Sequence, residues 1–386
     1  MTRRALVDIS QFMGRPIPSG VQRVLGHMAE WWDEDVVEAR FGYLEGSAYV
    51  TTEAAVFAAL VRDVFAHSGT VTESWAKERL RSRGSVVGLL DVPRLFGAYV
   101  LPEPAPRPDV VELLTSMLEE NEVPVCGVAY DAFPVTSPWL FQGIDLRPYD
   151  RFFNVFSRIE NMAFISEAVR VEFEDRLRRR PCRRGRVVPL GGDGLLEVPV
   201  EAAVDGSPTV VSVGSVEPRK RQALLVEAMD ELWAQGSDLG LLLLGRPGTE
   251  SKAFLDILRR RTKEGGPLRW LEEASDAVVA GALRRAAVMV FIGTDEGYGL
   301  PAVEALALGC PLIAAESLPA LARLGGGGQV RMAEVDKGRL VDALRYVTDP
   351  ANNGRLRQET ASVEIPRWQD FGRQLTHWVA EVIEDS

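Results

Sequence analysis

The chain has 386 residues, of which 46% are hydrophobic and 26% are charged. This length suits two domains of ~150–200 residues each, and the composition excludes a largely disordered chain. The 44 basic and 55 acidic residues give a net charge of −11, so nucleic acid is not an expected partner, because its binding depends on neutralising phosphates.

Cysteine usage and apolar runs narrow the class further. Cys126, Cys182 and Cys310 are far apart and form no CxxC pair, which excludes a disulfide framework and a zinc site. Asp8 interrupts the N-terminal apolar stretch, and no run approaches the ~18 apolar residues of a membrane helix. We therefore expect a cytoplasmic protein.

The first half of the chain alternates short apolar runs with helical patterns. Continuous apolar runs predict strands that are covered on both faces, as in a parallel sheet. A Gly- and Pro-rich loop precedes a helix that should begin near Val21, and residues 151–165 should pass from helix into strand. The other strands expected in this half lie at residues 5–9, 86–90, 123–129 and 186–189.

The second half begins after a glycine-rich linker at residues 191–207 and has a more regular rhythm. Strands that recur between helices predict βαβ units and a doubly wound sheet. The expected strands are 209–214, 239–245, 268–271 and 288–292, and the expected helices are 221–235, 251–263, 278–285, 301–308 and 368–383.

The loop at residues 214–220 brings two adjacent cations to the start of a helix. A helix N-terminus already favours anions, so cations are ordinarily unfavourable there. Arg219 and Lys220 therefore indicate a bound anion whose charge they share. The alternative is a pair of solvated surface cations.

A second loop, residues 294–304, combines glycines with two acids. Gly297 and Gly299 allow the backbone to approach a ligand closely. Glu296 in the loop and Glu304 in the following helix can accept hydrogen bonds from several hydroxyls. Because ligands of open α/β sheets bind beyond the carboxyl ends of the strands, this loop predicts a sugar-phosphate site. The alternative is a capped helix with solvated acids.

Three segments resemble glycosyltransferase family 4, in particular its mannosyltransferase-like members. They are the Val-Gly-Ser-Val-Glu-Pro-Arg-Lys run at 213–220, the EX7E block from Glu296 to Glu304, and the stretch at 166–191. The family implies retaining enzymes of the α/β GT-B fold, in which two Rossmann-like, doubly wound domains face a central cleft and a C-terminal helix crosses back to the first domain. The resemblance covers most of the chain and is strongest over residues 164–309.

The resemblance implies an N-terminal acceptor-binding domain, residues 1–190 plus 366–386, and a C-terminal donor-binding domain, residues 191–365. The implied activity moves a hexose from GDP-mannose or a UDP-hexose to a saccharide or lipid-linked acceptor in polysaccharide or glycoconjugate biosynthesis. The nucleotide-sugar is a substrate, so no cofactor is expected.

The resemblance also implies roles for individual residues. Lys220 would hold the donor diphosphate, Glu296 would contact the transferred sugar, and Glu304 would bind the ribose hydroxyls. The nucleotide base would lie near residues 270–272. The further donor-binding residues implied are Gly20, Arg23, Ser215, Arg219, Leu271, Gly297, Tyr298, Gly299 and Leu300.

Two positions depart from the family pattern. Many relatives carry an arginine where this chain has Ser215, and its role would pass to Arg219 or Arg23. Relatives often carry His-Asp where this chain has Tyr130-Asp131, and tyrosine does not titrate near neutral pH. Asp131 is therefore the expected acid or base, with Tyr130 on the acceptor side. The alternative for Asp131 is to cap the following loop.

The loops also bear on metal use. Backbone N–H dipoles together with Lys220 and Arg219 can stabilise a departing diphosphate. No Asp-X-Asp triplet stands in either loop to hold Mg²⁺ between phosphates. We therefore expect metal-independent transfer.

Seven arginines occur within the eleven positions from Arg176 to Arg186. One interpretation is peripheral contact with an anionic membrane or a lipid-phosphate acceptor, on the inner membrane face. The other is a solvated helix end and loop.

Two other functions compete with transfer. A non-catalytic GT-B scaffold or activator that keeps nucleotide binding would fit Tyr130 and Ser215, although it has no need for Lys220, Glu296 and Glu304. An NAD-dependent oxidoreductase is disfavoured because no GxGxxG turn follows the strand at 209–214.

Overall fold

A computed structural model describes residues 3–66, 71–141, 143–199 and 209–386, which form two compact units. One unit comprises Met1–Gly191 with Arg367–Ser386, and the other is Gly192–Pro366. The expected domain limits differ from this division by one residue at each junction. Residues 200–207 of the expected linker lie outside the described residues.

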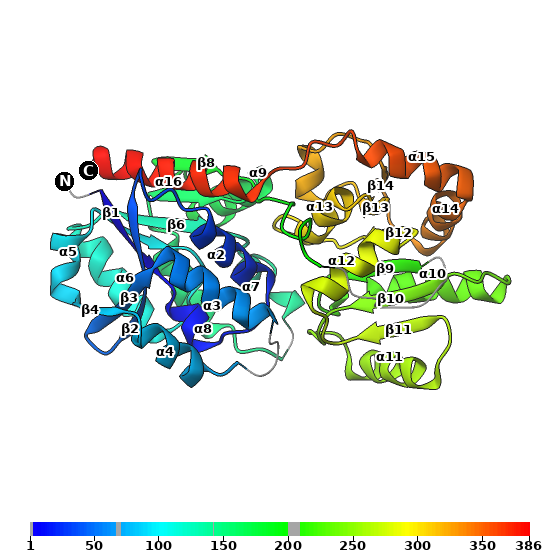
Figure 1. Cartoon of the computed structure of the whole chain (residues 1–386), viewed down its shortest axis with the longest axis horizontal. Helices are drawn as coiled ribbons and strands as arrows, with labels where there is room; N and C mark the ends of the chain where they lie inside the picture. Colours follow the sequence, from blue (N-terminus) through cyan, green and yellow to red (C-terminus); the bar gives the residue numbers. More distant parts are fainter. Residues whose placement is uncertain (1–2, 67–70, 142, 200–208) are drawn as a thin grey trace. The chain divides into compact units, whose positions relative to one another are not determined.

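The N-terminal unit contains an eight-stranded sheet in the order β4-β3-β2-β1-β5-β6-β7-β8 (Figure 1). The six strands β2-β1-β5-β6-β7-β8 run parallel to one another. Strand β3 pairs antiparallel with both β2 and β4. The strands are β1 (Arg4–Asp8), β2 (Glu38–Glu45), β3 (Ala48–Glu53), β4 (Ser85–Gly88), β5 (Ala98–Leu101), β6 (Val125–Ala129), β7 (Asn161–Phe164) and β8 (Arg184–Val187). The helices are α1 (Ser10–Gly14), α2 (Gly20–Glu30), α3 (Ala54–Ala66), α4 (Glu73–Arg81), α5 (Val92–Leu95), α6 (Pro108–Glu120), α7 (Phe133–Thr136), α8 (Arg147–Phe156), α9 (Glu167–Val171), the π-helical η3 (Glu172–Arg178) and α16 (Trp368–Glu384).

The expectation of a buried parallel strand at residues 86–90 is wrong. Strand β4 is short and antiparallel, and it forms one edge of the sheet. Val86 is 73% exposed, and Leu90, which lies beyond the strand in a 3₁₀ turn, is 90% exposed. An edge strand has a neighbour on one side only, so a continuous apolar run does not ensure burial. The run at 123–129 is the buried parallel strand β6, as predicted.

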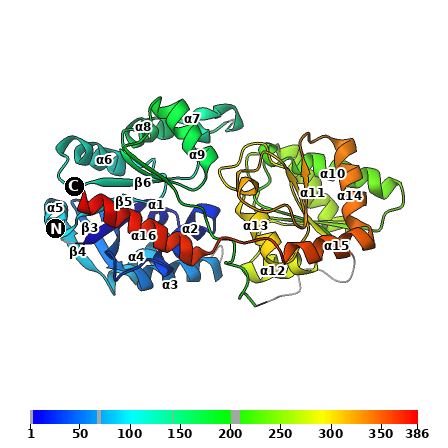
Figure 2. The same ribbon diagram turned by 90° about the horizontal axis from the view of Figure 1, so that it is seen from above.

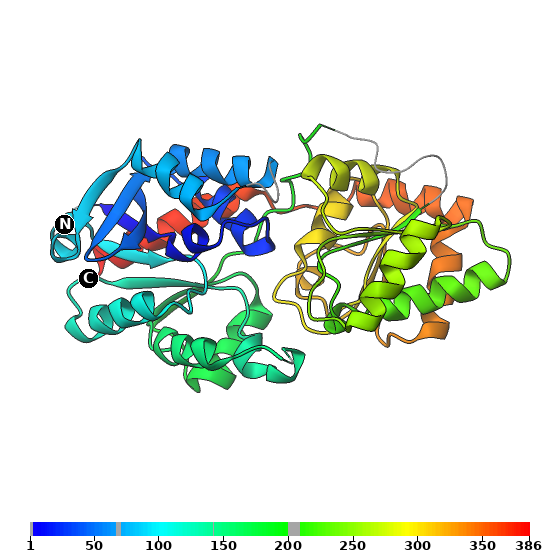
Figure 3. The same ribbon diagram turned by 90° about the horizontal axis from the view of Figure 1, so that it is seen from below.

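The C-terminal unit contains a fully parallel six-stranded sheet in the order β11-β10-β9-β12-β13-β14. Its strands are β9 (Thr209–Val213), β10 (Gly240–Leu244), β11 (Leu268–Leu271), β12 (Val288–Phe291), β13 (Leu312–Ala315) and β14 (Gln329–Met332). Its helices are α10 (Gln222–Ala234), α11 (Lys252–Glu264), α12 (Asp276–Arg285), α13 (Leu300–Ala307), α14 (Lys337–Thr348) and α15 (Pro350–Thr360). Figure 3 shows α10 in green packed beside α14 in orange. This strand order is that of a doubly wound Rossmann sheet, and the predicted strands of this half are confirmed to within two residues.

Helix α16 belongs to the N-terminal unit and packs along α2, as Figure 2 shows. The Trp368 ring stacks on His27 with ring centroids 4.3 Å apart, and Trp368 and Trp378 are both buried. The amphipathic pattern of α16 explains this docking, because its apolar stripe must be covered. The predicted return of the C-terminal helix to the first domain is confirmed.

Close approach of α16 to residue 31 makes Gly372 sensitive to substitution. A Cβ atom at Gly372 would lie 2.2 Å from the Trp31 carbonyl oxygen. Gly372→Ala should therefore destabilise the protein by ~2–3 kcal/mol through overpacking, measured as a lower thermal unfolding midpoint. Gly354→Ala is the control, because open space surrounds Gly354 in helix α15 and alanine there should stabilise by ~1 kcal/mol. Equal midpoints for the two variants would contradict this account.

Candidate functional site

The C-terminal sheet reverses its strand order between β9 and β12. In doubly wound sheets, the loops that follow the two strands at such a point form a crevice for ligands. Here these loops touch, because the Thr294 amide donates a hydrogen bond to the Arg219 carbonyl, 2.9 Å away. The topology thus brings together the two segments that the sequence singled out.

Arg219 links the acids of both loops. Its Nε donates to Glu217 Oε2 at 2.7 Å, and its guanidinium pairs with Glu296 Oε1 at 2.9 Å and with the Asp295 carbonyl oxygen at 2.6 Å. Ser215 donates its hydroxyl to the other oxygen of Glu217. Burial opposes ionisation of Glu217, but Arg219 and Lys220 hold its pKa below the usual value. The cluster is therefore ionic and largely shielded from water.

Lys220 lies inside this cluster. A Cβ atom at Gly214 would be 2.5 Å from Lys220 Nζ, and Gly214 has φ of +133°, so only glycine leaves room for the ammonium group. Burial lowers the pKa of Lys220, Arg219 lowers it further, and Glu296 opposes both effects. Arg219 and Lys220 are therefore not solvated surface cations.

Glu304, the second acid of the predicted site, lies in helix α13. Glu304 is 4% exposed and Glu296 is 13% exposed at its side chain, so neither is a solvated acid. Gly299 has φ of +100°, and a Cβ atom there would meet Leu318 at 2.4 Å. Tyr298 is also buried, which raises its pKa to about 12. Leu300 is the first residue of the helix.

Leu271 ends strand β11, beside the carboxyl end of β10. Its carbonyl accepts a hydrogen bond from the Gly245 amide at 3.0 Å, and Trp270 Nε1 donates to the Gly245 carbonyl at 2.8 Å. These bonds fix the end of β11 at the same edge of the sheet as the two loops. Its contact with a nucleotide base stays a prediction.

Four predicted residues lie in the N-terminal unit. Gly20 is the first residue of α2, and the Arg23 guanidinium lies over the Phe65 ring, 4.9 Å from its centroid. Tyr130 follows β6 and is 4% exposed. Asp131 Oδ1 accepts a hydrogen bond from the Phe133 amide at 3.4 Å, which is the loop-capping role given above as its alternative.

A second reversal of strand order, between β1 and β5, holds a buried carboxyl group that the sequence reasoning missed. Glu103 follows β5 and is 3% exposed, and its Oε1 accepts a 2.7 Å hydrogen bond from the Phe12 amide, in the segment that follows β1. Asp8 ends β1 and accepts hydrogen bonds from the hydroxyls of Tyr49 and Tyr99, both at 2.5 Å. The one local signal was an acid two residues after the apolar run Ala98–Leu101.

Burial raises the pKa of Glu103 to about 8. The hydrogen bond from the Phe12 amide lowers this pKa, and the negative charge of Asp8 raises it further. In the unfolded chain Glu103 ionises near pH 4.5, whereas in the folded chain it keeps its proton up to about pH 8. The free energy of unfolding that Glu103 contributes is therefore fully present below pH 4.5 and is lost as the pH rises through 8. Glu103→Gln should therefore gain stability relative to the unsubstituted chain between pH 5 and pH 9, on the order of 3 kcal/mol. Urea unfolding at both pH values measures this. The exposed Glu112→Gln should show no such gain, and a pH-independent difference for Glu103→Gln would contradict the assignment.

The arginine-rich segment is mostly neutralised within the N-terminal unit. Five of its seven arginines form ion pairs: Arg176 with Glu172, Arg178 and Arg180 with Glu160, Arg184 with Asp385, and Arg186 with Glu381. Arg179 and Arg183 are exposed and have no ion-pair partner among the described residues. The segment therefore forms ion pairs mainly within its own unit. Two of these pairs join it to Glu381 of α16 and to Asp385, which follows that helix.

Two kinds of feature are absent from the described residues. No helix there is long and apolar enough to cross a bilayer. In the same part of the chain, no group of three or more His, Cys, Asp or Glu side chains is placed to hold a metal ion.

Comparison with known proteins gives a family match for part of the chain. Residues 197–344 match the family model described as Glycosyl transferases group 1. The chain is 27% identical over 225 residues to the serotype-specific mannosyltransferase WbdA of Escherichia coli, covering 53% of this chain and 27% of the relative. It is 35% identical over 177 residues to a phosphatidyl-myo-inositol mannosyltransferase of Mycolicibacterium smegmatis, covering 42% of each. The chain therefore spans less than half the length of these relatives.

Solved structures resemble the whole chain. Anabaena HepE in complex with UDP and glucose aligns with a TM-score of 0.68 and 14% identity, over 98% of this chain and 99% of that one. The sucrose-phosphate synthase of Thermosynechococcus elongatus aligns with a TM-score of 0.66 and 17% identity over 100% of both chains. Together with the two doubly wound sheets, these likenesses identify the fold as GT-B, as the sequence predicted.

Proposed function

We propose that this chain is a retaining glycosyltransferase that moves a hexose, mannose in the first instance, from a nucleotide-sugar to a saccharide or glycolipid acceptor. The observation that carries the proposal is the shielded cluster of Lys220, Arg219 and Glu296, with buried Glu304 on the adjoining helix. The match of residues 197–344 to glycosyl transferases group 1 supports the reaction class. The two mannosyltransferase relatives support mannose, and the UDP-bound neighbour supports a nucleotide-sugar donor.

In the proposed complex the C-terminal unit holds the donor. Lys220 and Arg219 bind the diphosphate, since a charge-assisted hydrogen bond to phosphate is about twice as strong as a neutral one. Glu296 accepts hydrogen bonds from sugar hydroxyls, and Glu304 accepts them from the ribose. The amides at the start of α13 face the phosphate. The remaining proposed donor contacts are Ser215, Leu271, Gly297, Tyr298, Gly299 and Leu300, with Gly20 and Arg23 from the N-terminal unit.

The proposed reaction breaks the bond between the sugar C1 and the phosphate oxygen. The acceptor hydroxyl oxygen bonds to C1 from the face that the phosphate leaves, and its proton passes to the departing phosphate. Lys220 and Arg219 stabilise the negative charge that develops there, which is why we propose that no metal is required. Tyr130 and Asp131 orient the acceptor.

The proposal includes peripheral contact with an anionic membrane through the segment Arg176–Arg186. Arg179 and Arg183 support it, because their charges are exposed and not neutralised by described side chains. Co-sedimentation with anionic vesicles should fall when both are changed to glutamate. Pelleting that is independent of anionic lipid would contradict this part of the proposal.

Incubation with GDP-, UDP- and dTDP-sugars, with and without EDTA, tests the proposal. We expect nucleotide release from GDP-mannose, undiminished by EDTA, and an α-linked product by NMR when an acceptor is supplied. Nucleotide binding without release from any donor would instead favour the scaffold. An absorbance change at 340 nm with NADH would favour the oxidoreductase.

A further inference from the structure

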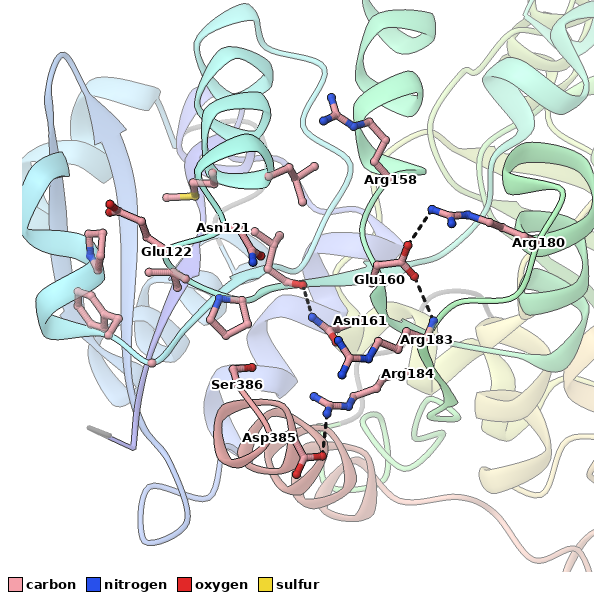
Figure 4. Close-up of a pocket in the computed structure, with 18 residues that line it drawn as sticks. Asn121, Glu122, Arg158, Glu160, Asn161, Arg180, Arg183, Arg184, Asp385 and Ser386 are labelled. Carbon is pink, nitrogen blue, oxygen red and sulfur yellow. Dashed lines mark hydrogen bonds and ion pairs between the residues drawn. The ribbon is translucent and has the colours of Figure 1, made fainter.

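A pocket of about 620 Å³ opens at the amino-terminal edge of the N-terminal sheet. Its lining residues come from the segments that lead into β5, β6, β7 and β8, including the end of α6, and from the tail that follows α16 (Figure 4). Asp8 ends its strand, and Glu103, Tyr130 and Asp131 follow the carboxyl ends of theirs, so the pocket lies at the opposite edge of the sheet. Its volume is within the ~300–1,000 Å³ range of small-molecule sites.

The two sides of the pocket differ in chemistry. The segments that precede β5 and β6 supply mainly apolar groups, together with Asn121 and Glu122, and those that precede β7 and β8 supply arginines. The apolar lining residues are Pro93, Phe96, Met117, Leu118, Val123, Pro124 and Val125. The basic lining residues are Arg158, Arg180, Arg183 and Arg184. The pocket is therefore amphipathic, with a cationic side built partly from the arginine-rich segment.

The cationic side carries more charge than its acids neutralise. Glu160 is already paired with Arg178, whose side chain is 1% exposed, at 2.9 Å, and it also accepts the Arg183 amide at 3.2 Å. Arg180 therefore shares a carboxylate that is already neutralised. The Arg183 guanidinium, which Figure 4 shows extending into the pocket, has no acidic partner among the side chains that the structure describes.

Arg184 is held by a group that a ligand can replace. Its guanidinium pairs at 2.7 Å with Asp385, whose side chain is 62% exposed. An exposed ion pair of this kind contributes little to stability. A bound phosphate could take the place of Asp385 and bridge Arg183 and Arg184, since guanidinium groups bind phosphate oxygens in a bidentate manner.

We propose that this pocket binds an amphiphilic phosphate ester, with its phosphate between Arg183 and Arg184 and its apolar part against Phe96, Met117 and Val123. The inference goes beyond the proposed transfer reaction and does not depend on it. The phosphate ester is either the exposed headgroup of a lipid or a free soluble molecule.

Calorimetric titration of the full chain with octyl phosphate, below its micelle concentration and without any sugar donor, tests the proposal. Binding should be at least ~10-fold tighter than for inorganic phosphate, because the octyl chain covers the apolar side. Arg183→Gln with Arg184→Gln should weaken it at least ~10-fold, while Arg147→Gln, at an exposed arginine of the same unit, should leave it unchanged. Asp385→Asn should tighten it about threefold, because it releases Arg184 from its competitor.

Co-sedimentation with vesicles of phosphatidylcholine and phosphatidic acid distinguishes a lipid headgroup from a soluble phosphate ester as the ligand of the pocket. Pelleting that requires Arg183 and Arg184 identifies a lipid headgroup, and titration without pelleting identifies a soluble ester; both support the site. Equal affinity of the double variant and Arg147→Gln for octyl phosphate, or no binding by the unsubstituted chain, overturns it. Because Asp385→Asn is expected to act in the opposite direction, loss of folding cannot imitate the full pattern.

Discussion

Replacing Lys220 with methionine should lower the rate of nucleotide release from the donor sugar by about 10³-fold. The ammonium group sits in a shielded cluster next to Arg219 and Glu296, where a fixed charge stabilises a departing diphosphate far better than it would in water. Methionine keeps the length and the apolar stem of lysine and removes only the charge. Release of GDP from GDP-mannose, followed at saturating donor, measures the effect.

Thermal unfolding separates this effect from misfolding. Burial lowers the pKa of Lys220, which means that the folded chain bears a cost for holding the charge. Lys220→Met should therefore unfold at the same or a higher temperature while losing activity. Lys252→Met, at an exposed lysine on α11, should alter neither property. Retention of more than about a tenth of the rate by Lys220→Met would refute the role assigned to this residue.

Replacing Glu304 with glutamine should weaken the binding of the free nucleoside diphosphate by about 30-fold, or ~2 kcal/mol. A carboxylate can accept hydrogen bonds from both ribose hydroxyls, whereas an amide offers one acceptor and turns a donor toward the other hydroxyl. Because Glu304 is 4% exposed, water cannot replace the lost interaction. Titration with GDP and UDP gives the dissociation constants.

The exposed Glu316→Gln, which lies in the same unit, is the control and should bind nucleotide normally. Because the ribose is common to GDP and UDP, the loss should appear for both nucleotides, and a loss confined to one of them would contradict the role. Unchanged affinity of Glu304→Gln for both would place the ribose elsewhere.

The sequence pattern alone predicted a strand correctly where the burial of that strand depends only on its own residues. Strands β10 and β12 of the C-terminal unit are short continuous apolar runs, and a fully parallel sheet buries such runs on both faces. The same reasoning failed at Val86, because whether a run lies at the centre or the edge of a sheet depends on the order of strands in space. The sequence also gave no sign that Leu90 would leave the strand for a turn.

The charge cluster was only partly predictable. Arg219 and Lys220 were identified from their place at a helix start, but the pairing of Arg219 with Glu296 joins residues far apart in the chain and requires the reversal between β9 and β12. The Glu103–Phe12 hydrogen bond spans 91 positions, so the burial of Glu103 does not follow from its local sequence, although its place just after a strand was visible there. Equally, the ion pairs that neutralise the arginine-rich segment come from distant acids such as Glu381 and Asp385.

The chain passes between the two units twice, near Gly191 and again near Arg367, and this has a consequence for dissecting the molecule. The segment Gly192–Pro366 is continuous and contains all six strands of its sheet, so it is the natural fragment to express alone. Truncation after Pro366, in contrast, would destabilise the half that is synthesised first, because it removes α16, whose buried face packs on α2. An excised N-terminal fragment needs residues 367–386 supplied in trans or fused by a tether.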